Sequence, residues 1–145
     1  MLGLALIFGF LAASAALLAQ VLLSIFITTP LTGAPSLTLL IGAATLEEGA
    51  KLIFLLQLGK RSFAPITFLS ALVFGVGFVG AEIALLTLST PSLPDFLAFG
   101  SIILVQIAGT LIIYSGLRLR ESFAFAPLFA LLTAILIHTL YNSSL

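Results

Sequence analysis

The sequence predicts an all-α fold, a polytopic bundle of about five transmembrane helices. Of the 145 residues, 61% are hydrophobic and only 7% are charged. A soluble domain carries about a quarter charged residues, so this chain has too little polar surface to cover a globule in water. Its apolar residues fall into five runs, and each run has the length of about 20 residues that a helix needs to cross the hydrocarbon core.

Proline, glycine and charged residues separate the five runs, as is typical of loops between spans. The predicted spans are residues 2–27, 36–58, 63–89, 95–117 and 122–141, in a single transmembrane domain of residues 1–145. Ser36 is expected to cap the second helix at its N-terminus. The first run is longer than the apolar part of a cleaved signal peptide and no basic residue precedes it, so a retained helix is expected.

Basic residues in the short loops predict the orientation of the chain. Lys60 and Arg61 lie between the second and third runs, and Arg118 and Arg120 lie between the fourth and fifth. Both loops fall on the same side of a five-span chain. We therefore expect a cytoplasmic N-terminus and an outside C-terminus, in a prokaryotic cytoplasmic membrane.

Small residues in the third run predict close helix packing. Residues 75–80 match the GxGxxG pattern, but no strand precedes them, so the context of a dinucleotide-binding loop is missing. Small pairs four residues apart, such as Ala71 with Gly75 and Gly77 with Ala81, instead allow two helix backbones to approach closely. Interhelical hydrogen bonds are expected from Gln20, Gln57, Gln106 and Thr110.

The composition limits the available chemistry. The formal net charge is zero, which gives no indication of a nucleic-acid partner. The chain has no Cys, so thiol nucleophiles, disulfides and Cys-ligated metals are excluded. An enzyme built on this chain must use carboxylates, one imidazole, hydroxyls and amides.

Four ionisable residues lie in the middle of predicted spans, namely Glu47, Glu48, Lys51 and Glu82. A charged group near the bilayer centre costs about 2.5–3.5 kcal/mol on insertion scales, so four cost on the order of 10 kcal/mol. Such a cost requires that the groups be paired, partly neutral or in contact with a water-filled cavity. These residues are therefore the first candidates for a functional site.

The spacing of these residues brings them together on one helix face. Glu47 and Lys51 are four residues apart and Glu48 and Lys51 are three apart, so both carboxylates can reach the same ammonium group. Two adjacent carboxyl groups, one ionised and one neutral, suit general acid–base catalysis. The spacing leaves open which glutamate is the base, and also allows a purely structural ion pair.

The last span contributes His138 and Asn142, which are four residues apart and share a face. Rough depths along the helices place Glu47, Glu48, Glu82 and His138 in the outer half of the bilayer, where they could line one outward-opening cavity. Taken singly, His138 could also be an interfacial residue and Asn142 a helix C-cap.

Three motifs follow one another on separate spans, namely Glu47-Glu48-x-x-Lys51, Phe78-x-x-x-Glu82 and His138-x-x-x-Asn142. Together they resemble the PrsW-type intramembrane proteases, a branch of the superfamily of CAAX prenyl proteases and bacteriocin-processing enzymes. The CAAX branch typically has Glu-Glu-x-x-x-Arg and Phe-x-x-x-His, so the position of the Lys and the presence of Glu82 favour the PrsW branch. The resemblance covers spans two to five.

The resemblance implies an endopeptidase that uses activated water to cut a membrane-anchored protein within the bilayer. Its implied catalytic residues are Glu47, Glu48, Glu82, His138 and Asn142, with Lys51 and Phe78 in support. Glu47 or Glu48 would be the general base, and Glu82 would position the water or a metal. His138 and Asn142 would stabilise the oxyanion or complete a metal site. If a metal assists, the implied ligands of a Zn²⁺ ion are Glu48, Glu82 and His138.

Two departures from the family motivate other functions. Members usually have seven or eight spans and a second His before the last span, whereas His138 is the only His here and the fourth run offers Gln106 and Thr110. The alternatives are a catalytically inactive scaffold or binding protein of the same fold, and a homo-oligomer that completes the site. A proton-coupled carrier is a further alternative because buried Glu and Lys also mark ion pathways, although no inverted repeat is evident.

Overall fold

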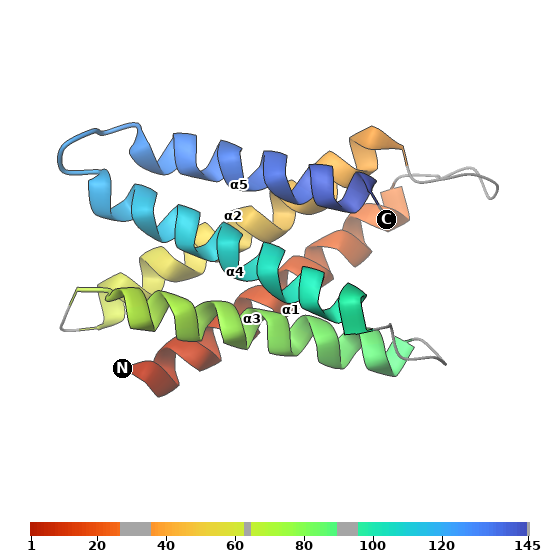
Figure 1. The fold of residues 1–145 in the computed structure, drawn as a ribbon, viewed down its shortest axis with the longest axis horizontal. Coiled ribbons are helices and arrows are strands. Elements are labelled where there is room, and N and C mark those ends of the chain that lie inside the picture. Colours follow the sequence, from red (N-terminus) through yellow and green to blue (C-terminus); the bar gives the residue numbers. More distant parts are fainter. Residues whose placement is uncertain (27–35, 63–64, 90–95, 145) are drawn as a thin grey trace.

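The computed structural model describes residues 1–26, 36–62, 65–89 and 96–144. Over these ranges the regular elements are five α-helices (Figure 1). They are α1 (Leu2–Phe26), α2 (Leu37–Arg61), α3 (Phe68–Ser89), α4 (Phe96–Leu119) and α5 (Ala126–Ser143). The predicted all-α bundle is therefore confirmed, with one helix for each apolar run.

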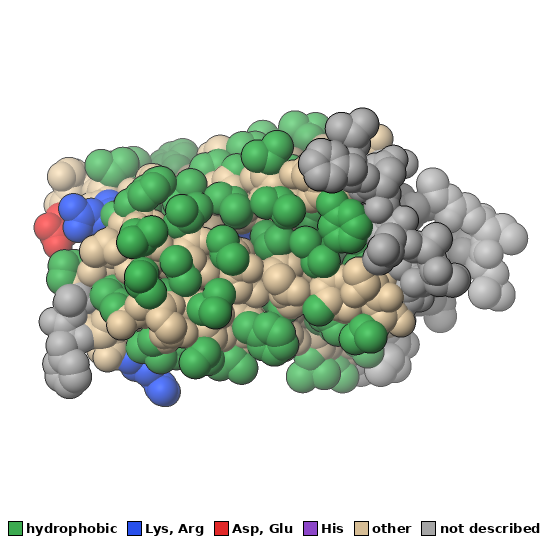
Figure 2. All heavy atoms as spheres, turned by 60° about the horizontal axis from the view of Figure 1, so that its bottom comes forward, with side chains coloured by type: hydrophobic (Ala, Val, Ile, Leu, Met, Phe, Trp, Pro, Cys, Tyr) green, Lys and Arg blue, Asp and Glu red, His purple; other side chains and the backbone are tan. Residues whose placement is uncertain are grey.

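The bundle is that of an integral membrane protein. Four helices, α1, α3, α4 and α5, are long and apolar enough to cross a membrane. Hydrophobic side chains cover the length of the face in Figure 2, and the Lys, Arg and Glu atoms that it shows gather toward one end. Helix α2 has 25 residues but carries three charged side chains in its middle, and it turns two of them, Glu48 and Lys51, fully into the bundle.

The helices alternate in direction. Helices α1, α3 and α5 run one way and α2 and α4 run the other, so the N-terminus and the turns after α2 and α4 lie at one end (Figure 1). We call this the basic end, because it holds Lys60, Arg61, Arg118 and Arg120. Around the bundle the contacts follow the order α1, α3, α4, α5, α2 and back to α1, and α2 also touches α4 across the interior. Helix α2 thus faces three other helices, which lets its polar residues meet groups from several directions.

Glycines let α1 and α3 cross at very short range. A Cβ atom at Gly9 of α1 would collide with the backbone carbonyl of Phe74, and one at Gly77 of α3 would collide with the carbonyl of Leu6. Only glycine permits so close an approach of two backbones. The small residues Ala5 and Ala12 of α1 are fully buried on the same side.

A second small position of α3 faces α4. A Cβ at Gly75 would lie 3.4 Å from the hydroxyl of Thr110, which is ordinary close packing. The whole stretch of residues 75–80 lies inside α3, so the GxGxxG match forms no phosphate-binding loop. The sequence prediction of close helix packing is confirmed for both neighbours of α3.

The ends of α2 follow capping rules. The Ser36 side chain accepts a hydrogen bond from the backbone N–H of Leu39 at 3.3 Å, as predicted for an N-cap. The helix continues through Gly59 to Arg61, three residues beyond the predicted end, and Ser62 caps it. A glycine inside a helix lowers stability by only about 1 kcal/mol relative to alanine, an amount that tertiary packing can offset.

The predicted starts of the third and fifth spans were too early. Helix α3 begins at Phe68, where the Thr67 hydroxyl caps the first turn by accepting from the N–H of Ser70 at 3.1 Å. Helix α5 begins at Ala126, with Pro127 in its first turn. A series of tight turns precedes it instead of continuous helix.

The α1–α3 crossing yields a stability prediction. Replacing Gly77 by Ala should lower the free energy of unfolding by about 1–3 kcal/mol, since the new methyl group forces the two backbones apart. Gly80→Ala, on the same helix, is the matched control because a Cβ there meets no atom within 4 Å. Reversible unfolding in mixed micelles measures both. Equal stability of the two variants would contradict the crossing.

Candidate functional site

A buried ion pair stands at the centre of α2. Glu48 and Lys51 are both 0% exposed, and the Lys51 ammonium lies 2.6 Å from Glu48 Oε1. Their three-residue spacing puts them on the same side of the helix, the side that faces α4 and α5. The ring of Phe78 on α3 lies 4.6 Å from the ammonium and adds a cation–π contact.

Gln106 of α4 connects this ion pair to two further carboxyl groups. Its side-chain carbonyl accepts a hydrogen bond from the Lys51 ammonium. Its Nε2 donates to Glu47 Oε2 at 3.0 Å and to Glu82 Oε2 at 2.6 Å. One amide group therefore holds side chains of α2 and α3 together.

His138 of α5 lies between the two adjacent glutamates of α2. Its Nδ1 is 2.8 Å from Glu48 Oε1, and its Nε2 is 3.5 Å from Glu47 Oε2. Only 3% of the residue is exposed. The imidazole is thus fixed by the buried Glu48 and directed at the less buried Glu47.

Helix α1 completes the arrangement with Gln20, whose Nε2 donates to Glu47 Oε1 at 2.7 Å. Every helix thus supplies at least one polar side chain. We call this set the polar network; its members are Gln20, Glu47, Glu48, Lys51, Glu82, Gln106 and His138. Because both oxygens of Glu47 accept hydrogen bonds, its carboxylate is held in one orientation.

A glycine makes room for the buried carboxylate. A Cβ atom at Gly109 of α4 would lie 2.7 Å from Glu48 Oε2. This oxygen is buried and accepts no hydrogen bond from any described residue, whereas Oε1 contacts both Lys51 and His138. The site therefore orients Glu48 through one oxygen and packs the other against the backbone of α4.

A cavity of about 340 Å³ reaches the polar network from between α1, α2 and α3. Glu47, Glu82 and Gln20 form its polar wall. The remaining lining is apolar and includes Ala13 and Ala16 of α1, whose small side chains leave the space open. Glu48 and Lys51 do not line this cavity, so of the α2 ionisable groups only Glu47 faces it.

The structure brings together Glu47, Glu48, Glu82 and His138, as their depths along the helices suggested. They lie in the half of the bundle farther from the basic end. Lys51 forms its ion pair with Glu48, and none with Glu47 among the described residues. Asn142 is half-buried, one turn beyond His138, and no hydrogen bond joins it to the polar network.

The central role of Gln106 was missed by the sequence analysis. It was expected to make an interhelical hydrogen bond, which it does, and was otherwise noted only as what the fourth run offers in place of a second His. An interhelical bond was also expected of Gln20, Thr110 and Gln57. Gln20 does so, but Thr110 bonds to the Gln106 carbonyl within its own helix, and Gln57 is exposed. The available signal was depth, because Gln106 lies as far along α4 as Glu47 lies along α2.

The expected zinc ligands do not form a metal site in this geometry. Among the described residues, no three His, Cys, Asp or Glu side chains converge as metal ligands. Glu48 Oε1 is occupied by Lys51 and His138, and Glu82 Oε2 by the Gln106 amide.

Fold and site together define the class of this protein as an integral membrane helix bundle with a buried network of carboxylates, an ammonium and an imidazole. No protein-family model, curated protein or solved structure matches the chain. The function must therefore be inferred from the geometry of the polar network and the cavity beside it.

The ion pair yields a second stability prediction. Lys51→Met should lower the free energy of unfolding by about 3–5 kcal/mol, because it leaves Glu48 as an uncompensated buried charge. The double variant Glu48→Gln with Lys51→Met removes both charges and should recover a large part of this loss. Unfolding in mixed micelles measures both variants. Additive losses in the double variant would show that the two groups do not interact.

Proposed function

We propose that the protein is an intramembrane endopeptidase, which hydrolyses a peptide bond of a membrane-anchored protein. The observation that carries the proposal is the sharing of one amide group by two carboxyl groups that line the same cavity. Gln106 Nε2 donates to both Glu47 and Glu82, and both face the space between α1, α2 and α3. Two carboxyl groups held around one small cavity can divide the tasks of general base and general acid.

Glu47 is the proposed general base. It takes a proton from a water molecule in the cavity, and the water oxygen attacks the carbonyl carbon of the scissile peptide bond. Glu82 is the proposed general acid and gives a proton to the leaving nitrogen as the C–N bond breaks. The products are a free carboxyl group and a free amine, and one water is consumed.

The remaining residues of the polar network position these two groups. Glu48 is fully buried and holds His138 through Nδ1, which leaves Nε2 directed at Glu47. Lys51 fixes Glu48 and the Gln106 carbonyl at once. In this proposal Glu48 and Lys51 are positioning residues, and His138 stabilises charge on Glu47 as its protonation changes.

The cavity also suggests the kind of substrate. Its apolar walls and its position between helices that face lipid suit a segment that lies within the membrane. Attack on a peptide carbonyl requires that the segment leave its helical conformation locally, which costs least next to polar groups that can bind the freed backbone groups. Gln20 places a polar side chain at the cavity wall.

The resemblance of the three motifs to PrsW-type proteases supports the same function.

An inactive scaffold is the second candidate function, and the bonding within the polar network favours it. Both functional groups of the Gln106 amide and both oxygens of Glu47 are already bonded within the protein, as in a structural network. A proton-coupled carrier is the third candidate, because hydrogen bonds connect the ionisable groups of Lys51 and Glu82 through the Gln106 amide.

The catalytic proposal predicts that Glu47→Gln and Glu82→Gln each lower cleavage of a single-span peptide in liposomes by at least about 100-fold, since each removes one proton-transfer group. Both variants keep the shape of the side chain, so the fold should remain. Arg61→Gln is the control because it also replaces a charged group by an amide, and Arg61 is exposed and outside the polar network. Mass spectrometry of the peptide products measures the rate.

The alternatives give different results in the same variants. A scaffold would show no cleavage in the unaltered protein and would keep its partner in Glu47→Gln. A carrier would show proton flux into liposomes that depends on Glu82. Cleavage that survives in both Glu47→Gln and Glu82→Gln would overturn the assignment of acid and base.

A further inference from the structure

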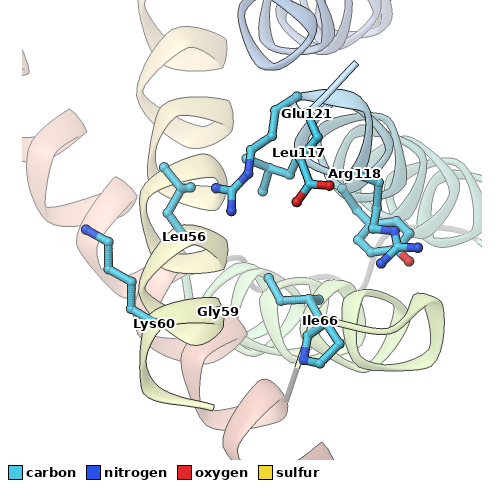
Figure 3. Close-up of a pocket in the computed structure, with 10 residues that line it drawn as sticks. Leu56, Gly59, Lys60, Ile66, Leu117, Arg118 and Glu121 are labelled. Atoms are coloured by element: carbon cyan, nitrogen blue, oxygen red, sulfur yellow. The ribbon is translucent and has the colours of Figure 1, made fainter. Parts of the chain in front are cut away.

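A second cavity of about 330 Å³ lies at the basic end, where α2 and α4 finish and the segment before α3 begins (Figure 3). Charged residues at its wall are Lys60, Arg118, Arg120 and Glu121. The side chain of Glu121 points into the space between α2 and the start of α3, whereas the Lys60 ammonium extends to the other side of α2 (Figure 3). The charges available within this cavity are therefore two guanidinium groups and one carboxylate.

Among the described residues, these three charged side chains form no ion pair with one another or with any other side chain. Ion pairs among the described residues are confined to the polar network, so neither Arg118 nor Arg120 pairs with Glu121. All three side chains are exposed. Opposite charges that line one cavity without pairing can each bind a different group of a ligand that carries both signs.

The opposite part of the cavity is apolar. Leu56, Ile66 and Leu117 line it, and Tyr114 adds a ring with a hydroxyl group. Exposed apolar side chains lie near the cavity, such as Ile53 on α2 and Phe68 on α3. The cavity thus lies at the boundary between charged turns and lipid-facing surface, where Tyr is typical. A small soluble anion would gain nothing from the apolar wall.

We propose that this cavity binds the headgroup of an amine-bearing phospholipid, such as phosphatidylethanolamine. Arg118 and Arg120 hold the phosphate, for which guanidinium groups are well suited. Glu121 accepts hydrogen bonds from the primary ammonium group, and Leu56 and Ile66 contact the glycerol and the first acyl carbons. Basic cavities between membrane helices are known to bind lipid headgroups, and the unpaired carboxylate adds selectivity for an amine.

The proposal is tested by native mass spectrometry of the delipidated full chain in detergent. The probes are phosphatidylethanolamine, phosphatidylcholine and phosphatidylglycerol with the same acyl chains. Phosphatidylethanolamine should be retained best, and Arg118→Gln with Arg120→Gln should lower its retention by about tenfold or more. Arg61→Gln is the matched control, since it removes one charge at the same end but lies over the Phe8 ring and outside the cavity.

A second variant tests the role of the carboxylate. Glu121→Gln leaves both arginines in place and should remove the preference for phosphatidylethanolamine over phosphatidylglycerol without abolishing binding. The unfolding temperature of each variant is first measured without lipid. It should equal that of the unaltered protein, so that a fold defect is not mistaken for lost binding. Equal retention of the three lipids by the unaltered protein, or an equal loss in Arg61→Gln, would overturn the proposal.

Soluble O-phosphoethanolamine distinguishes the source of the headgroup. If the cavity binds a lipid, a large excess of this compound should leave phosphatidylethanolamine in place, because it lacks the glycerol and acyl groups that contact the apolar wall. Displacement of the lipid by the soluble compound would overturn the lipid assignment and identify a water-soluble aminophosphate as the ligand.

Discussion

The buried ion pair of Glu48 and Lys51 is the interaction on which the rest of the site depends. Each group alone would destabilise a helix that lies among apolar neighbours, and the pair is tolerated because further donors and acceptors surround it. His138 contacts one oxygen of Glu48, and the Gln106 carbonyl accepts from Lys51. These contacts require helices α4 and α5 to pack against α2 at one level, so the charges determine the register of three helices.

The close crossing of α1 and α3 has the complementary effect. Where Gly9 and Gly77 allow backbone contact, no space remains between the helices. Farther along, at Ala13, Ala16 and Gln20, a cavity lies between α1, α2 and α3 and exposes Glu47 and Glu82. The fold thus places a tightly packed contact on the side of the basic end and an accessible pair of carboxyl groups beyond it.

The fold class and much of the site could be predicted from the sequence, because both follow from strong constraints. Five apolar runs of spanning length predict a helix bundle, because each helix satisfies its own backbone hydrogen bonds within the bilayer. The free-energy cost of burying charge indicates that Glu47, Glu48, Lys51 and Glu82 must have polar partners. Depth along the helices was enough to expect His138 near them.

The detailed roles could not be predicted, because they depend on helix rotation and neighbour order. The sequence does not show that α4 rather than α3 lies against α2, and so it does not show that Gln106 links Glu47 with Glu82. It also does not show that Gly109 gives space to the Glu48 side chain. The sequence therefore cannot distinguish Glu48, which is buried, from Glu47, which faces the cavity. Asn142 matched a motif by spacing alone, and its side chain makes no hydrogen bond to the polar network.

The position of the cut in a substrate tests the central claim most directly. Glu82 lies two helical turns, about 10 Å, from the end of α3 that is opposite the basic end. Mass spectrometry of a single-span peptide cleaved by the reconstituted protein should therefore place the cut within the hydrophobic segment, in the half away from the basic end. A cut outside the membrane on the side of the basic end, or no cleavage of any peptide in a panel by folded protein, would contradict the account.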